Sequence, residues 1–220
     1  MTDQSNSPGF LFDLDGVIIN SESEYSRIWI KINEEYPTGI DKMEEKIKGC
    51  TLSKILNEYY SDNETRDAVA KRLHELEDEM VYDYLPFAES FLQKLKEKNI
   101  RCALVTSSDN KKMDHLVKDI PDILSYFDFV VTGDMVTKSK PSPEGYLLGA
   151  EKICKDPKRC VVFEDSLQGV MAGKNAGALV VGIAGTLPAE TLRPYSDLII
   201  NDFSELNPED LILKIFENDK

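Results

Sequence analysis

Two aspartates follow the apolar run GFLF near the amino terminus, with one leucine between them. Because side chains alternate along a strand, Asp13 and Asp15 start on the same side, roughly 7 Å apart, and both can address one ligand. Two uncompensated carboxylates beside an apolar strand repel and lose hydration, so one stays protonated or a cation lies between them. A solvated strand end that feeds a turn at Gly16 is the simpler alternative. An EF-hand fits poorly, because Val17 and Ile18 occupy the places of a ligand and the obligatory glycine.

Polar side chains also follow the second apolar run, RCALV. Thr106, Ser107 and Ser108 come directly after it. Asp109 and Asn110 then lie at an expected helix start, where backbone N–H groups favour an anion. Taken alone, this pattern is equally typical of a helix cap.

A lysine and a second acidic pair complete the set. Lys140 precedes Pro141, which biases it towards an extended backbone, and Glu164 and Asp165 follow the run CVVF. Singly, these are typical of a solvated lysine and a helix cap. Ligands of open α/β sheets bind outside the carboxyl ends of the strands, so the groups are expected to meet there. Together they predict a phosphoryl-transfer site, with Mg²⁺ suited to Asp13 and Asp165.

The elements that position these groups alternate between strand and helix. Short apolar runs predict strands at 9–14, 101–106, 127–132, 160–165, 178–184 and 197–201. Helical patterns separate most of them, and Ser166 and Gly177 are the expected cap and end of one helix. The pattern predicts an α/β fold with right-handed crossovers. Residues 17–84 show no strand-like run and predict an inserted helical cap domain, a lid over the aspartates. The core domain is then 1–16 and 85–220.

Composition limits the partners. The 220 residues carry a net charge of −14, which disfavours nucleic acid as a partner. The chain shows no leader-like start and no apolar run near the roughly 20 residues that span a bilayer, and its four cysteines have no CxxC spacing. We therefore expect a cytoplasmic monomer with reduced thiols, no membrane contact and a small phosphorylated substrate. His74 and His115 have no partner at a recognisable spacing and are expected at the surface.

The set of motifs resembles the haloacid dehalogenase superfamily, specifically its β-phosphoglucomutase-like phosphatases and mutases with a helical cap. The resemblance rests on DLDGV, VTSS, KSKPSP and EDS, in that family's order. It implies a Rossmann-like parallel sheet with helices on both faces. It also implies that Asp13 is the nucleophile of an aspartyl-phosphate intermediate and that Asp15 is the general acid and base. Mg²⁺ would be held by Asp13, Asp165 and the backbone carbonyl of Asp15, with Glu164 as a ligand or beside one.

The resemblance also assigns residues around the phosphate. Thr106 would bind a phosphoryl oxygen and Lys140 would neutralise charge in the transition state. Weaker candidates around the same anion are Ser107, Ser108 and Asn110. Substrate choice is expected on cap residues facing the sheet, for which the candidates are Tyr25, Trp29, Lys48, Cys50 and Thr51, although Trp29 is equally typical of a cap core.

Two departures from the family pattern bear on the reaction. Tyr25 aligns with a cap histidine of the sugar-phosphate mutases, and Leu52 stands where they carry an arginine that grips a second phosphate. Loss of a guanidinium removes a strong interaction with that phosphate. We therefore expect a phosphatase acting on a sugar or polyol phosphate. A phosphohexose mutase is the first alternative, and a phospho-receiver or inactive binding module is an alternative of another class. A dehalogenase fits less well, because that branch lacks the second aspartate.

Overall fold

The computed structural model describes residues 8–217, and its centre is one parallel sheet with strand order β3-β2-β1-β4-β5-β6. The strands are β1 (Gly9–Phe12), β2 (Arg101–Val105), β3 (Phe129–Val131), β4 (Cys160–Glu164), β5 (Leu179–Ile183) and β6 (Leu198–Ile200). All six expected strands are present. The direction of strand order reverses at β1, which lies between β2 and β4, so the carboxyl end of β1 is a switch point where ligands bind in such sheets.

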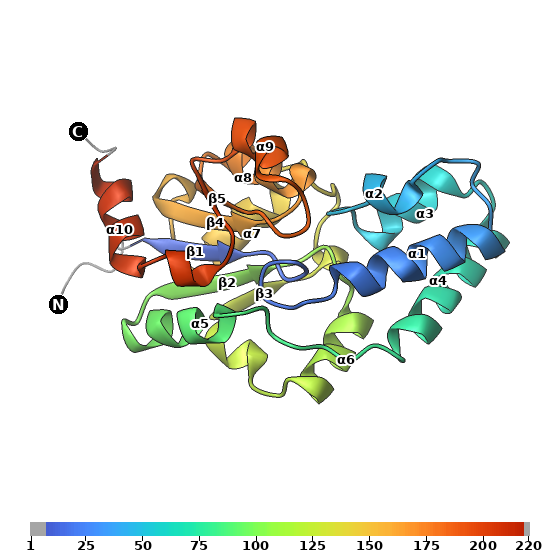
Figure 1. Ribbon diagram of the computed structural model, residues 1–220, viewed down its shortest axis with the longest axis horizontal. Coiled ribbons are helices and arrows are strands. Elements are labelled where there is room, and N and C mark those ends of the chain that lie inside the picture. Colours follow the sequence, from blue (N-terminus) through green and yellow to red (C-terminus); the bar gives the residue numbers. More distant parts are fainter. Residues whose placement is uncertain (1–7, 218–220) are drawn as a thin grey trace.

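Helices cover both faces of the sheet, as expected for this class (Figure 1). Along β1, Phe10 and Phe12 join one apolar cluster and Leu11 joins the other, because successive side chains alternate. The cluster of Phe10 includes side chains of α5 (Ala88–Glu97), α6 (Asn110–Asp119) and α10 (Pro208–Glu217). The cluster of Leu11 includes side chains of α7 (Glu144–Lys152), α8 (Leu167–Ala176) and α9 (Ala189–Leu192). Short 3₁₀ turns are η2 (Ile123–Tyr126), η3 (Gly133–Met135), η4 (Pro157–Arg159), η5 (Arg193–Tyr195) and η6 (Phe203–Glu205).

Packed phenylalanines support the strand that leads to Asp13. The rings of Phe12 and Phe163 stack with centroids 4.5 Å apart, and Phe91 and Phe203 stack at 4.8 Å. Burial of each such side chain contributes roughly 1.5–3 kcal/mol. The carboxyl ends of β1 and β4 are therefore held on a closely packed base.

The segment between β1 and α5 is helical and lies at one end of the molecule (Figure 1). Its helices are α1 (Glu22–Glu35), α2 (Met43–Lys46), α3 (Leu52–Tyr59) and α4 (Asn63–Glu77). We call α1 to α4 the cap helices. Ile28 and Ile32 of α1 and Val69 and Leu73 of α4 are buried, and each pair is spaced four residues apart, so its side chains share one face of the helix. The two connections to the sheet run side by side: the N–H of Asn20 donates to the Asp83 carbonyl at 3.0 Å.

Local signals at α8 also agree with the sequence. The Ser166 hydroxyl accepts a hydrogen bond from the N–H of Gly169, and Gly177 ends the helix with a φ of 82°. The histidine prediction was wrong, since the His74 and His115 side chains are only 15% and 14% exposed. Both have a partner at helical spacing, Glu77 three residues after His74 and Asp119 four residues after His115. The contact of His74 with Asp109, the N-cap of α6, is the one that sequence spacing does not reveal.

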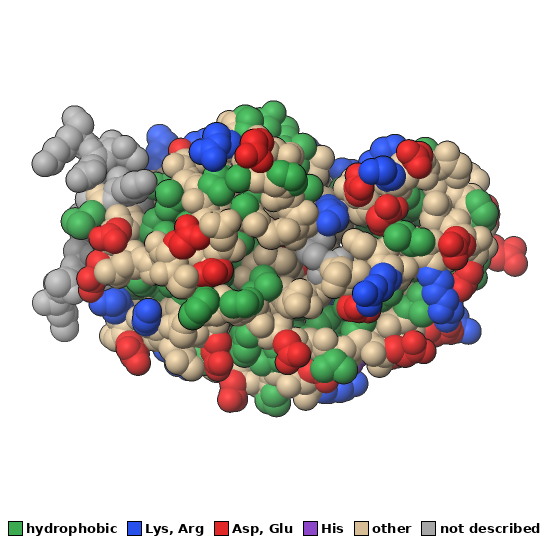
Figure 2. Space-filling model, viewed as in Figure 1, with side chains coloured by type: hydrophobic (Ala, Val, Ile, Leu, Met, Phe, Trp, Pro, Cys, Tyr) green, Lys and Arg blue, Asp and Glu red, His purple; other side chains and the backbone are tan. Residues whose placement is uncertain are grey.

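The net negative charge of the chain is not confined to one part of the surface. Acidic side chains are spread over both the sheet region and the cap helices on the face drawn in Figure 2.

Cys102 and Cys160 are buried, whereas Cys50 is partly exposed and Cys154 is exposed, and all four are free thiols. Within residues 8–217, the helices are too short or too polar for any of them to cross a bilayer.

Candidate active site

Asp13 lies directly after β1 and faces Lys140. The N–H of Asp13 donates to the carbonyl of Phe163 at 3.0 Å, which fixes its backbone to β4. The Lys140 ammonium lies 2.6 Å from Asp13 Oδ1, and Asp13 is 8% exposed. The sequence places these residues 127 positions apart, and the switch point of the sheet brings them into contact.

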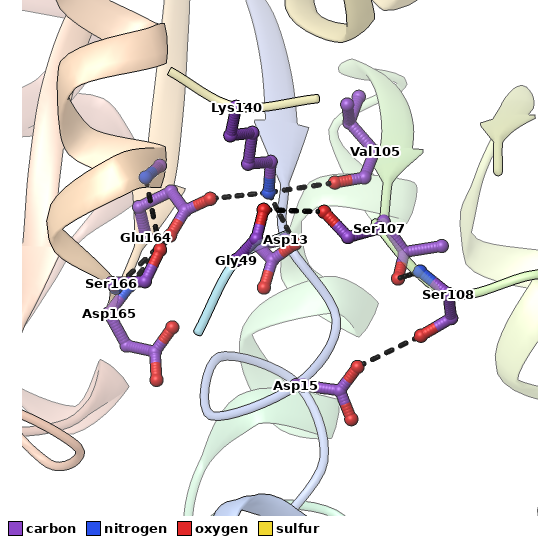
Figure 3. A network of polar contacts seen from close by, with 12 residues as sticks. Asp13, Asp15, Gly49, Val105, Ser107, Ser108, Lys140, Glu164, Asp165 and Ser166 are labelled. Atoms are coloured by element: carbon purple, nitrogen blue, oxygen red, sulfur yellow. Dashed lines mark hydrogen bonds and ion pairs between the residues drawn. The ribbon is translucent and has the colours of Figure 1, made fainter. Parts of the chain in front are cut away.

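Lys140 is shared between two carboxylates (Figure 3). Its ammonium also lies 2.5 Å from Glu164 Oε1 and 3.4 Å from the Val105 carbonyl. The Tyr146 hydroxyl of α7 donates to the same Glu164 oxygen at 2.7 Å. The lysine is therefore held from three sides with its charge directed at Asp13.

The charges around Asp13 favour its protonated form. Burial raises the pKa of Asp13 to about 8; Lys140 opposes that shift, and Glu164 and Asp15 add to it. Burial lowers the pKa of Lys140, but the two carboxylates outweigh it and raise the pKa well above the usual value. One buried ammonium thus compensates one carboxylate, and Asp13 keeps its proton near neutral pH. A second cation beside Asp13 would favour the ionised form of this carboxylate.

An acidic group suited to a metal ion surrounds this point. Single oxygens of Asp13, Glu164 and Asp165 all lie within 4.8 Å of one another, and all three residues are buried. Glu164 Oε2 already accepts from the N–H of Asp165 at 3.1 Å and from the N–H and hydroxyl of Ser166 at 3.2 and 3.0 Å. Both Glu164 oxygens are therefore engaged by donors, so Asp13 and Asp165 fit the part of direct ligands better.

Gly16, the glycine of the DLDG motif, lies where no other residue fits. Its φ is 72°, and a Cβ built on it would lie 1.9 Å from Asp165 Oδ2. A side chain there would be strained and would displace that carboxylate. The turn after Asp15 can therefore approach the end of β4 only because the residue is glycine.

Asp15 points to a different set of donors from Asp13. It accepts hydrogen bonds from the Ser21 hydroxyl and from the Ser108 hydroxyl at 3.0 Å. The ammonium of Lys112 lies 2.5 Å from Asp15 Oδ1. Burial raises the pKa of Asp15, but Lys112 and the two serines outweigh it and lower the pKa below the usual value. Asp15 is therefore held as an anion.

The three hydroxyl side chains after β2, those of Thr106, Ser107 and Ser108, each have a different hydrogen-bond partner. Ser107 Oγ donates to the Gly49 carbonyl of the cap segment at 2.9 Å, and Thr106 Oγ1 accepts from the N–H of Ser108 at 3.0 Å. Thr106 is buried. Asn110 is exposed and its Oδ1 accepts from a threonine hydroxyl at 3.2 Å, so among the described contacts it faces away from the aspartates.

A cavity separates the cap helices from the ends of the strands. The sheet side contributes Asp13, Asp15, Ser107, Ser108, Asp109, Lys112, Asp165 and Ser166. The cap side contributes Tyr25, Ser26, Trp29, Glu44, Ile47, Lys48, Gly49, Cys50, Leu52, Ile55, Leu73 and Glu77. Thr51 instead caps α3, with Oγ1 accepting from the N–H of Lys54, and its own N–H donates to Ser139 Oγ at 3.0 Å.

Sequence reasoning missed Lys112 and Tyr146. Tyr146 lies on a helix whose other buried residues are small or apolar, so its hydroxyl gives no separate signal. Lys112 did carry one: Lys111 and Lys112 occupy the first turn of α6, where a helix disfavours positive charge. A lysine placed against the dipole indicates that another partner compensates it.

Comparisons with known proteins agree with this geometry. Residues 10–183 match the haloacid dehalogenase-like hydrolases. The chain is 33% identical over 174 residues to a phosphorylated carbohydrates phosphatase of Thermotoga maritima, covering 76% of this chain and 80% of that protein. It is 30% identical to hexitol phosphatase A of Escherichia coli, covering 90% and 92%. A β-phosphoglucomutase structure from Clostridium difficile has a TM-score of 0.81 at 27% identity, over 96% of this chain and 98% of that one. The chain belongs to the haloacid dehalogenase-like hydrolases.

Proposed function

We propose that this hydrolase is a Mg²⁺-dependent phosphatase of a small phosphorylated sugar or polyol, acting through a phosphorylated Asp13. The observation that carries the proposal is the convergence of Lys140, Glu164 and Asp165 on that one carboxylate. The relatives named as phosphatases of carbohydrates and hexitols support the substrate class.

The side chains divide the reaction between two steps. An Asp13 oxygen forms a bond to phosphorus while the bond from phosphorus to the ester oxygen breaks. Asp15, an anion in the free protein, must take up a proton as the phosphate ester binds, and it then passes this proton to the departing ester oxygen. Water then attacks the phosphorus as Asp15 takes up its proton, and this releases phosphate and restores the Asp13 carboxylate. Lys140 neutralises charge on the transferred group and keeps Asp13 aligned.

The acidic group fits a hard divalent cation, since carboxylates are the ligands that Mg²⁺ prefers. Asp13 and Asp165 would hold it together with the carbonyl of Asp15, and Glu164 would orient Lys140. The ion supplies positive charge that lets an anionic carboxylate meet an anionic phosphate.

The proposal includes a division into a core, residues 1–16 and 85–220, and a cap, residues 17–84. Two hydrogen bonds that join these parts support a cap that closes over the cavity: Ser107 to Gly49, and Thr51 to Ser139. Product leaves when they break.

The cap side of the cavity favours an uncharged leaving group. It presents Glu44 and Glu77 beside apolar Trp29 and Leu52. A second phosphate would meet Leu52 where the mutases carry an arginine, and Lys48 on the same side is accompanied by the acids Glu44 and Glu77. Hydrolysis is therefore favoured over transfer to another position on a sugar.

The test is phosphate release from a panel of polyol and sugar phosphates. We expect turnover that requires Mg²⁺ and is lost in Asp13→Asn, with Asp67→Asn as the control because Asp67 is exposed on α4. Turnover that persists in Asp13→Asn refutes the proposal. Glucose 6-phosphate formed from β-glucose 1-phosphate and a bisphosphate primer, without free phosphate, would identify a mutase. A phosphoenzyme that lasts many minutes without ester turnover would identify a receiver-like module.

A further inference from the structure

Lys112 is a buried cation outside the set of residues that the family motifs identify. It lies in the first turn of α6, its side chain is 4% exposed, and its ammonium contacts Asp15 Oδ1 at 2.5 Å. Burial and the positive end of a helix both disfavour an ammonium there. The lysine is tolerated because Asp15 lies beside it.

Aromatic rings complete the surroundings of this ammonium. It lies 4.0 Å from the centroid of the Tyr25 ring and 5.8 Å from that of Tyr82. Tyr25 belongs to cap helix α1, and its hydroxyl donates to Glu77 of cap helix α4 at 2.5 Å. The ring that covers Lys112 is therefore fixed by two cap helices.

We infer that Lys112 is a positioning residue that holds the Asp15 carboxylate for hydrolysis of the phosphorylated Asp13, and that the Tyr25 ring makes this position depend on the cap. The inference rests on the proposed function. Ser21 and Ser108 also donate to Asp15 but are neutral, whereas the Lys112 ammonium brings a full positive charge to this carboxylate and so holds it more strongly.

The contact between Lys112 and Tyr25 makes the position of the Asp15 carboxylate depend on whether the cap is open or closed. With the cap helices as described, the ring shields the ammonium from water and leaves Asp15 as its charged partner. A cap that moved away would take the ring with it and hydrate the ammonium, and the ion pair would weaken. Water is then activated efficiently only beneath a closed cap.

Burst kinetics with p-nitrophenyl phosphate test this role. Nitrophenolate leaves without a proton, so formation of the phosphoenzyme gives a rapid burst and its hydrolysis sets the steady rate. In Lys112→Met we expect a nearly unchanged burst rate and a steady rate lowered by about 100-fold, at the low end of general-base effects. Lys111→Met is the matched control, because Lys111 is the exposed neighbour on the same helix. Lys112→Gln replaces it if the methionine variant does not fold.

A double-mutant cycle tests the link to the cap. Tyr25→Leu is expected to lower the steady rate in the wild-type background and to add little in Lys112→Met, whereas Tyr25→Phe, which keeps the ring, retains most of the rate. Full additivity of Tyr25→Leu and Lys112→Met overturns the link.

Three results separate the inference from the proposed function. Burst and steady rates that fall together, or that both stay unchanged, in Lys112→Met overturn the inference while the phosphatase stands. A wild-type chain that turns over no phosphate ester overturns the proposed function. A crystal structure of Lys112→Met tests the inference without any measurement of activity. We expect the Asp15 carboxylate to lose its hydrogen bonds to Ser21 and Ser108, and an unmoved carboxylate overturns the inference.

Discussion

Binding of Mg²⁺ should release a proton from Asp13, because the metal needs the ionised carboxylate. Burial raises the pKa of Asp13 to about 8 in the metal-free protein. A group with that pKa is about nine-tenths protonated at pH 7, so binding at this pH should release about 0.9 proton. Below that pKa the affinity should rise roughly tenfold for each unit of pH, and it should level off above it.

Calorimetric titration with Mg²⁺ measures this release directly. Repeating the titration at pH 7 in two buffers of different ionisation enthalpy gives the number of protons exchanged, and a series from pH 6 to 9 gives the slope of affinity. Asp13→Asn should bind more weakly and release no proton from this position. Asp67→Asn should match the wild type.

The sign of the effect follows from the direction of the pKa shift. Raising a carboxyl pKa favours the protonated form in the metal-free protein, so higher pH favours the bound form. If binding releases no proton at pH 7 and the affinity is constant from pH 6 to 8, Asp13 is already ionised. The conclusion that Lys140 alone does not keep Asp13 ionised would then be wrong.

Other perturbations test the packing around the site. Gly16→Ala should lower the free energy of unfolding in urea by more than about 2 kcal/mol and abolish Mg²⁺ binding, because its Cβ meets Asp165. Gly177→Ala, with a similar φ but a nearest contact of 3.8 Å, should cost only about 1 kcal/mol and keep activity; equal losses in both variants would contradict the clash. Tyr146→Phe should cost about 1–3 kcal/mol and lower kcat, since Glu164 loses a buried donor; unchanged stability and kcat would count against this role.

The sheet and its ligand edge could be predicted because both depend on local patterns. Apolar runs identify the strands, and the rule for carboxyl ends places Asp13, Lys140 and Asp165 together without any knowledge of packing angles. The caps at Ser166 and Gly177 follow from residue type and spacing alone.

The surroundings of Asp15 could not be predicted because they depend on how helices pack. Whether Lys112 faces the aspartate or solvent is decided by the rotation of α6 against β2. Whether Tyr25 covers it depends on the angle of the cap helices, which no short spacing encodes. Ser107 and Asn110 carry the right chemistry in sequence, but the fold directs them to Gly49 and Thr132.

The central place of β1 affects how the chain is made. Phe10 pairs with Cys102 on one side and with Val161 on the other, so both neighbours lie far later in the chain. During synthesis the apolar residues of β1 leave the ribosome long before β4 exists to shield them. Until β4 has been translated, one edge of β1 has no partner strand and is open to pairing with another chain, which is a route to aggregation during synthesis.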